Sequence, residues 1–218
     1  MKSFAVIGMG RFGSAIAVAL YEQGHDVMAV DKCSEKIQAI SNKVTHAVTA
    51  DVTDEEVVKS LGISNFDAVV ISIASDMETS ILLTVMLRDL NVGYIIAKAQ
   101  NDIHARILEK VGADKIVFPE RDTAYRIAHN IAISNVINYI EVYPNFNIVE
   151  IEIPSKWVDR PLKELALRAK YGLNVIAVKD TRLDHIDTNP GADTVLKSGQ
   201  TLVVSATEDA IKEINKIK

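Results

Sequence analysis

The chain has 218 residues, of which 48% are hydrophobic and 24% charged, and its formal net charge is −5. This composition fits a globular protein with room for one large domain or a domain and a smaller module, and the lack of basic runs argues against nucleic acid as a partner. The single cysteine, Cys33, excludes an intrachain disulfide and a cysteine-based metal site, as suits the reducing cytoplasm. We see no signal peptide and no apolar run near the roughly 20 residues that span a bilayer, so we expect a cytoplasmic protein that reaches a membrane only through another chain.

Residues 4–14 predict a strand, a tight turn and the start of a helix. Apolar residues end at Gly8, and Gly8, Gly10 and Gly13 have the spacing G-x-G-x-x-G. The first glycine permits the turn, the second lets a pyrophosphate approach the backbone, and the third lets helix and strand pack closely. Phosphate then binds at the N-terminus of the helix. Arg11, followed by Phe12, puts a positive charge inside this turn, which favours a ligand with additional phosphate.

Short β-branched runs then alternate with helical patterns as far as residue 118. Strands are expected at residues 4–8, 27–30, 45–50, 68–73, 94–98 and 115–118, with a helix between each pair. This strict alternation predicts an α/β fold with a Rossmann-like, doubly wound parallel sheet and right-handed crossovers.

Residues 121–143 carry apolar side chains in near-helical spacing and predict one helix, which Pro144 ends. Ile133 and Ile137 lie off the main apolar stripe. A helix that packs only on its own sheet needs one stripe, so the second stripe indicates contact with another subunit, or else burial between two domains of one chain.

The pattern changes after residue 144. Strands are expected at 146–153, 174–178 and 201–205, with helices at 162–170 and 208–218. We therefore expect a nucleotide-binding domain at 1–120, a connecting helix at 121–143 and a small α+β domain at 144–218.

Polar residues just past the predicted strands are the candidate ligand contacts, because ligands of such sheets lie outside the carboxyl ends of the strands. They are Asp31, Asp51, Ser75, Lys98 and Glu120. Asp31 ends the second strand, where an acid binds the ribose diol and repels a 2′-phosphate, so an adenosine ligand without that phosphate is favoured.

Of the other four candidates, Lys98 has one predicted role, and the other three each have two alternative roles. Asp51 either accepts from an adenine amino group or caps the next helix. Ser75 either contacts the ligand or caps the long helix that follows, and Asp76 is the other candidate for that cap. Lys98 can reach phosphate as a point charge. Glu120 has the wrong sign for direct phosphate contact; it either holds a divalent cation, Mg²⁺ or Ca²⁺, against the phosphates, or complements the dipole of the helix that follows.

We find no catalytic constellation opposite this cleft. Tyr94 and Lys98 have the Tyr-x-x-x-Lys spacing of short-chain dehydrogenases, but on a strand their side chains lie about 13 Å apart. The five histidines fall in unrelated elements, and there is no G-x-S-x-G motif. We therefore expect a ligand-gated regulator that is not an enzyme; the alternative is an NAD(H)-binding oxidoreductase or redox sensor that uses the same cleft.

Several runs resemble the cytosolic regulatory subunits of Ktr-type potassium uptake (KtrA/KtrC-like), which are RCK proteins (regulators of potassium conductance) with TrkA-N and TrkA-C domains. The resemblance covers essentially the whole chain. Its runs are VIGMGRFG at 6–13, VD at 30–31, AKAQN at 97–101, GADKIVFPE at 112–120 and RAKYG at 168–172.

This resemblance implies an octameric ring built from dimers and docked beneath a membrane potassium translocator of the KtrB/KtrD type, peripheral to the inner face of the membrane. ATP and ADP would compete for the cleft, and ATP would favour the conducting state. Arg11 would reach the γ-phosphate of the nucleotide in the neighbouring subunit, Lys98 would hold phosphate and Asp31 the ribose. Glu120 would hold a divalent cation between paired ATP molecules, and residues 121–143 would form the crossover helix of the dimer.

The resemblance also implies that the C-terminal (RCK-C) domain binds cyclic di-AMP at a dimer interface, which would inhibit uptake. The matching stretch is 165–177. Arg168 and Asn174 are its candidate polar contacts, with Val175 and Ile176 beside them.

Overall fold

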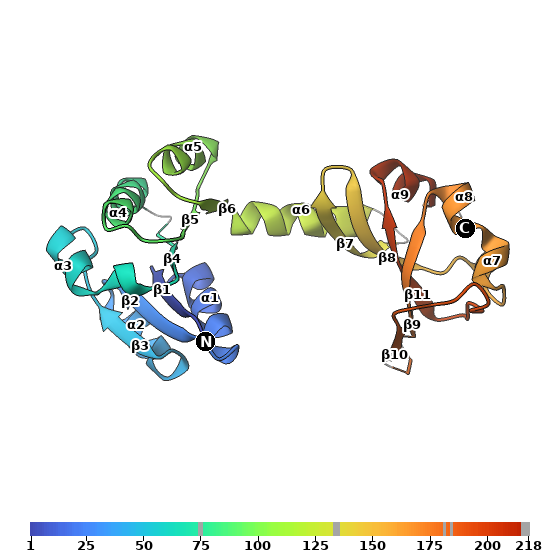
Figure 1. The fold of residues 1–218 in the computed structure, drawn as a ribbon, viewed down its shortest axis with the longest axis horizontal. Coiled ribbons are helices and arrows are strands. Elements are labelled where there is room, and N and C mark those ends of the chain that lie inside the picture. Colours follow the sequence, from blue (N-terminus) through green and yellow to red (C-terminus); the bar gives the residue numbers. More distant parts are fainter. Residues whose placement is uncertain (74–75, 133–135, 181, 184, 215–218) are drawn as a thin grey trace. The chain divides into compact units, whose positions relative to one another are not determined.

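A computed structural model describes residues 1–73, 76–132, 136–180, 182–183 and 185–214. The chain divides into two compact units, Met1–Glu120 and Arg121–Lys218 (Figure 1). Within the described ranges, no helix is long and apolar enough to cross a bilayer.

The described part of the first unit contains a six-stranded parallel sheet in the order β3-β2-β1-β4-β5-β6. The strands are β1 (Ser3–Ile7), β2 (Asp26–Asp31), β3 (His46–Thr49), β4 (Ala68–Ile71), β5 (Ile95–Lys98) and β6 (Lys115–Val117). This is the strand order of dinucleotide-binding folds, in which the direction of winding reverses between β1 and β4. The predicted α/β, doubly wound parallel sheet is confirmed, and the reversal places the binding crevice at the carboxyl ends of these two strands.

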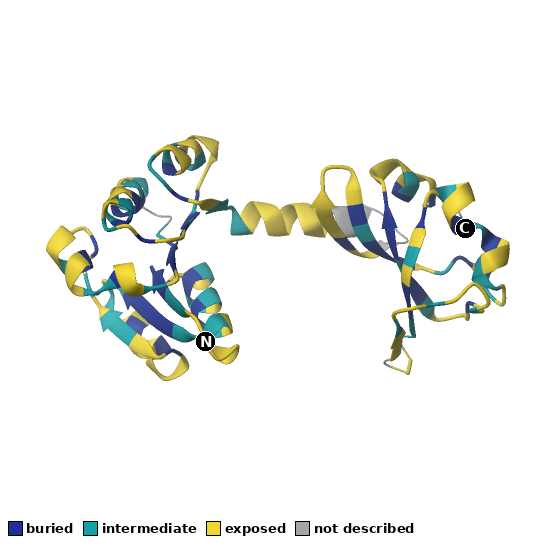
Figure 2. Ribbon diagram, viewed as in Figure 1, coloured by how far each residue is buried: buried dark blue, intermediate teal, exposed yellow. Residues whose placement is uncertain are grey.

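Helices cover both faces of this sheet. They are α1 (Arg11–Glu22), α2 (Ser34–Ile40), α3 (Glu55–Ser60), α4 (Met77–Asp89) and α5 (Asp102–Lys110), with 3₁₀ turns at Ser41–Lys43 and Ile63–Asn65. Because side chains alternate along a strand, Ile7 packs with Leu83 of α4 and Leu108 of α5, whereas Val6 packs on the other face with Ile37 of α2. Figure 2 shows β1, β2 and β4 mostly buried between the two layers.

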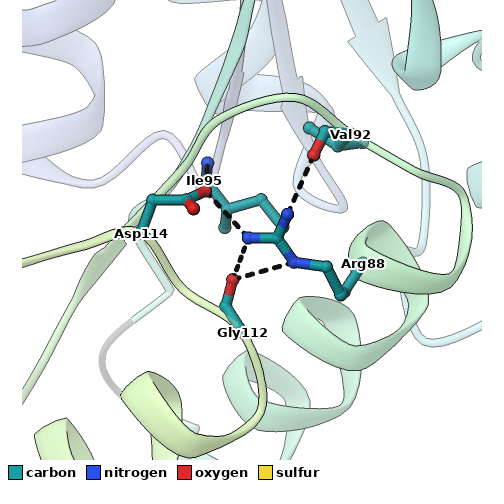
Figure 3. A network of polar contacts seen from close by, with 5 residues as sticks. All are labelled: Arg88, Val92, Ile95, Gly112 and Asp114. Atoms are coloured by element: carbon teal, nitrogen blue, oxygen red, sulfur yellow. Dashed lines mark hydrogen bonds and ion pairs between the residues drawn. The ribbon is translucent and has the colours of Figure 1, made fainter.

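Arg88 of α4 joins three segments near the amino-terminal edge of the sheet (Figure 3). Its guanidinium donates to the Gly112 carbonyl oxygen through Nε (3.0 Å) and also through Nη2, to the Val92 carbonyl at 3.3 Å, and to the Asp114 carboxylate at 2.8 Å. Asp114 also accepts the Ile95 backbone N–H at 2.7 Å. The first residues of the 112–120 run therefore fix the ends of α4 and α5 against the start of β5.

The second unit contains a five-stranded antiparallel sheet in the order β10-β9-β11-β8-β7. Its strands are β7 (Val136–Tyr143), β8 (Phe146–Glu152), β9 (Asn174–Asp180), β10 (His185–Asp187) and β11 (Gln200–Ala206), and its helices are α7 (Leu162–Leu165), α8 (Leu167–Tyr171) and α9 (Glu208–Ile214), with a 3₁₀ turn at Ser155–Trp157. Trp157, Leu167 and Ile211 pack against Val149 and Leu202 of the sheet. The predicted small α+β domain is confirmed.

The predicted helix at 121–143 is wrong in its last part. Helix α6 runs from Pro119 to Ala132, and Val136–Tyr143 is strand β7, paired antiparallel with β8. Pro144 and Asn145 (φ +62°) form the connecting turn, with the proline-first, left-handed-second arrangement of a type II turn. Pairing with β8 overrides the helical periodicity because the β-branched and aromatic side chains of 136–143 suit a strand. Ile133 lies outside the described residues, and Ile137 is an exposed residue of β7.

Candidate functional site

The three glycines after β1 have three different geometries. Gly8 has φ +97°, a conformation that favours glycine. A Cβ on Gly13 would lie 2.0 Å from the Gly8 carbonyl oxygen, so helix α1 can approach β1 only without a side chain there. A Cβ on Gly10 would meet no atom within 4 Å, and Gly10 lines the cleft described below. The turn therefore leaves open backbone at Gly10, where a phosphate can approach.

Asp31 ends β2 and fixes the loops around it. Its Oδ2 accepts the Met9 backbone N–H at 2.7 Å, its Oδ1 accepts the Cys33 backbone N–H at 2.9 Å, and Lys36 Nζ lies 3.3 Å from Oδ2. The side chain is 8% exposed. Burial raises the pKa of this carboxyl, but the hydrogen bonds from Cys33, Met9 and Lys36 outweigh it and hold the pKa below its ordinary value. Asp31 is therefore a fixed carboxylate at neutral pH.

A cleft of about 270 Å³ lies at the carboxyl edge of the parallel sheet and brings together residues that are distant in sequence. Its lining includes the predicted site residues Gly8, Gly10, Asp31, Asp51 and Lys98. Ser75 lies outside the described residues.

Sequence reasoning missed other polar residues of the lining, namely Lys32, Lys36, Thr53, Ser72 and Thr79, and it treated Asp76 only as a helix cap. The two lysines had a usable signal, since they closely follow the acid that ends β2. Asp76 does cap α4, accepting from the Thr79 backbone N–H at 3.0 Å.

Asp51 follows β3 and holds its own loop. Its Oδ1 accepts from the Thr53 backbone N–H at 3.1 Å and from Thr53 Oγ1 at 2.8 Å, and these bonds lower the pKa of Asp51. The N-cap of α3 is Asp54, which accepts from the Glu56 backbone N–H at 2.9 Å. The expectation that Asp51 caps this helix is therefore wrong, and its side chain lines the cleft.

Lys98, which lines the cleft, forms an ion pair with Glu120. Lys98 Nζ lies 2.5 Å from Glu120 Oε1, and the exposed fractions of the two side chains are 14% and 76%. Lys98 Nζ also lies 6.0 Å from the centroid of the Phe12 ring. The hydrogen bond from Lys98 lowers the pKa of Glu120 most, and the charge of Arg11 lowers it further. Glu120 is therefore paired with Lys98, and the charge of Arg11 also acts on it.

Glu120 belongs to no cluster of metal-ligating side chains in the part of the chain that the structure describes. Among the described residues, no group of three or more histidine, cysteine or acidic side chains could hold a metal ion. A single carboxylate is compatible with Mg²⁺ when phosphate oxygens complete the coordination. The donor set thus fits a cation that arrives with a nucleotide.

The second unit has an open hollow of about 430 Å³ at helices α7 and α8. The two helices are separated at Ala166, which has φ +48°, so the single helix predicted at 162–170 is wrong. Arg168, Asn174 and Val175 line the hollow, together with Leu162, Lys163, Ala166, Leu167, Ala169, Leu173, Pro190, Gly191 and Ala192. Ile176, the next residue of β9, is exposed and is not among the lining residues.

Two solved structures resemble parts of this fold. The match to the RCK domain of GsuK covers 99% of this chain and 47% of the GsuK chain, with a TM-score of 0.67 and 17% identity. This chain therefore spans about half the length of that one. The NAD(P)-binding domain of an exopolyphosphatase-related protein from Archaeoglobus fulgidus matches 61% of this chain and 98% of its own, with a TM-score of 0.54 and 29% identity. The GsuK likeness supports the fold of this chain.

Sequence comparison covers nearly the whole chain. Residues 4–119 match the TrkA-N domain and residues 148–218 the TrkA-C domain. The chain is 44% identical to Ktr system potassium uptake protein C of Bacillus subtilis strain 168, over 99% of this chain and 96% of that one. It is 39% identical to Ktr system potassium uptake protein A of the same strain (97% and 94%), and 34% identical to protein A of Vibrio alginolyticus (100% and 97%). The chain belongs to the TrkA-N/TrkA-C family and, within it, to the relatives of the Ktr potassium uptake proteins.

Proposed function

We propose that this chain is the nucleotide-sensing regulatory subunit of a Ktr-type potassium uptake system. The observation that carries the proposal is the convergence of the open backbone at Gly10, the fixed carboxylate of Asp31 and the ammonium group of Lys98 on one cleft. These groups suit phosphate and ribose. The relatives are named as potassium uptake proteins, and we therefore propose that the bound nucleotide regulates potassium uptake.

In this proposal ATP and ADP compete for the cleft. Contacts to adenine and ribose are common to both nucleotides, so these contacts set affinity and shift no equilibrium between states. Only groups that contact the third phosphate can make ATP favour one state of the protein over the other. We assign this role to Arg11, acting on the nucleotide of a neighbouring subunit, and to a divalent cation at Glu120.

We further propose that the chain forms dimers through α6 and β7 and that these dimers build an octameric ring beneath a membrane potassium translocator of the KtrB/KtrD type. Large apolar side chains are exposed on both elements, among them Tyr125, Ile127, Ile131, Ile140 and Val142, and Figure 2 shows much of α6 exposed. Extended exposed apolar surface marks an interaction site. Such a protein would be cytoplasmic and peripheral to the membrane through its partner.

Calorimetric titration of the full chain with ATP, ADP and NADH, with and without Mg²⁺, tests the nucleotide part. We expect ATP and ADP to bind the same site in competition, and Mg²⁺ to tighten ATP binding more than ADP binding. Tight NADH binding that ATP does not displace would contradict the proposal.

NAD(H) sensing is the alternative use of the same cleft. The 29% identical Archaeoglobus domain is an NAD(P)-binding domain, and the GsuK channel has been solved both with NAD and with ADP. The fixed Asp31 carboxylate favours a ribose without 2′-phosphate, as in NAD(H), ATP and ADP alike. Competition between NADH and ATP at equal concentration separates the two uses.

The hollow at α7 and α8 supports a second binding function, which we propose to be inhibition by cyclic di-AMP. Arg168 supplies a cation for phosphate and Asn174 an amide for a base edge, beside apolar Leu167 and Val175. Arg168→Ala should abolish cyclic di-AMP binding by the full chain and leave ATP binding unchanged. Unchanged cyclic di-AMP affinity in this variant would contradict the assignment.

A further inference from the structure

The Lys98–Glu120 ion pair lies where the proposed function requires a cation–phosphate contact. Lys98 ends β5 and lines the cleft, and its ammonium group is 2.5 Å from the Glu120 carboxylate. Each group is therefore the present partner of the other. A nucleotide phosphate that approaches Lys98 meets a cation that is already neutralised.

The burial of the two partners is unequal. Lys98 is 14% exposed, so leaving its ammonium group without a counter-ion would be costly, whereas Glu120 is 76% exposed and can be hydrated if it leaves. A phosphate oxygen can replace the carboxylate oxygen as the acceptor for Lys98. Replacement thus costs little for Glu120 and keeps Lys98 paired.

Resting on the proposed function, we propose that Glu120 is an internal counter-ion that competes with nucleotide phosphate for Lys98. Phosphate binding displaces the carboxylate and so releases the first turn of α6 from the end of β5. Glu120 is the second residue of α6, and from Arg121 on this helix belongs to the second unit. The exchange therefore converts occupation of the cleft into a change at the helix that leads to the second unit.

The exchange also implies the order in which the nucleotide and the divalent cation bind. Before it, Glu120 is neutralised by Lys98 and lies in the field of Arg11. After it, a carboxylate and a phosphate group lie close together with the same sign, and this pair attracts a divalent cation. The cation thus binds best after the phosphate has displaced Glu120.

Calorimetric titration of the full chain with ATP in excess EDTA tests the competition. Glu120→Gln removes the competing charge from an exposed side chain, and thermal unfolding checks that the variant folds. Because the Glu120 side of the pair is exposed and phosphate replaces it as the partner of Lys98, we expect cation-free ATP affinity to rise only about two- to fivefold. With Mg²⁺ we expect the opposite sign, a weaker affinity than in the unchanged chain. Glu109→Gln, which removes an equal charge from the exposed far end of α5, should alter neither value.

The Lys98→Gln background separates competition from simple charge repulsion. If Glu120 acts by pairing with Lys98, the gain in ATP affinity from Glu120→Gln is smaller in this background than in the unchanged chain. An equal gain in both backgrounds would mean that Glu120 acts only by repelling phosphate, and it would overturn the proposal. Unchanged or weaker cation-free affinity in the single Glu120→Gln variant would also overturn it, even where ATP binds normally with Mg²⁺. A chain that binds NADH and does not bind ATP would instead overturn the proposed function.

Discussion

Asp31 and Met9 are joined by a 2.7 Å hydrogen bond from the Met9 backbone N–H to the Asp31 carboxylate. The acid that we propose as the ribose contact therefore also fixes the glycine turn that we propose as the phosphate site. The proposal therefore makes both ligand affinity and local stability depend on this one side chain.

We predict that Asp31→Asn destabilises the chain by about 1–3 kcal/mol, because the Met9 and Cys33 N–H groups lose a charged acceptor. The folded-state pKa of Asp31 is lowered, so its contribution is present above the ordinary pKa of 3.8 and is lost as the pH falls through the folded-state value. Urea unfolding of both chains between pH 7 and pH 3 measures this. The exposed Asp89→Asn in α4 is the control, and equal loss in both variants would contradict the prediction.

Gly10→Ala and Gly13→Ala make a matched pair that separates ligand contact from packing. A Cβ at Gly13 meets the Gly8 carbonyl oxygen at 2.0 Å, whereas one at Gly10 meets no atom within 4 Å. We expect Gly13→Ala to lose about 1–3 kcal/mol or more of unfolding free energy. Gly10→Ala should keep the unfolding free energy of the unchanged chain but bind ATP and ADP at least tenfold more weakly. This is a loss of about 1.4 kcal/mol or more of binding free energy. Normal nucleotide affinity in Gly10→Ala would show that phosphate does not approach this backbone.

Arg88→Lys should destabilise the first unit without changing nucleotide affinity. Lysine cannot replace the forked contact with the Gly112 carbonyl, Val92 and Asp114 (Figure 3), and we expect a loss of about 1–3 kcal/mol. Thermal unfolding and ATP titration of the same sample separate the two effects. An equal loss in the exposed control Arg106→Lys would mean that the network itself contributes nothing.

Glu150 of β8 gives the second unit its own acid sensitivity. Its carboxylate is 9% exposed and accepts from Thr201 Oγ1 and Asn138 Nδ2, both at 2.7 Å, with Lys179 Nζ at 3.4 Å. Burial raises the pKa of Glu150, but these partners bring it below the ordinary 4.5. Its stabilising effect is therefore present above pH 4.5 and disappears as the pH falls through the folded-state pKa. We expect the stability difference between the unchanged chain and Glu150→Gln to shrink below pH 4.5; a constant difference would be the contrary result.

Local pattern was sufficient to predict the first unit and much of its site. The spacing of Gly8, Gly10 and Gly13 and the acid at Asp31 are sequence-local features, and between a strand and a helix they predict the turn and the cleft. The Lys98–Glu120 pair was not predictable as a pair, since it depends on β5 and β6 being neighbours in the sheet. These residues were assigned separately, one to phosphate and one to a cation.

The error at 136–143 has a different cause. Its apolar residues satisfy helical spacing almost as well as strand alternation, and the choice is made by pairing with β8, a tertiary interaction. Pro144 and Asn145 can be recognised in the sequence as a turn between two strands. A proline also ends a helix, so this pair did not decide between a helix and a strand at 136–143.

The ratio of ATP to ADP affinity in the unchanged chain and in Arg11→Ala tests the central claim most directly, namely that the cleft distinguishes the two nucleotides. Arg11 begins α1 directly after Gly10, which lines the cleft, and the charge of Arg11 acts on Glu120. Calorimetric titration of both nucleotides into both full-length proteins, with Mg²⁺ present, gives the four affinities. We predict that Arg11→Ala keeps ADP binding and loses the preference for ATP. An unchanged ATP to ADP affinity ratio would contradict the account.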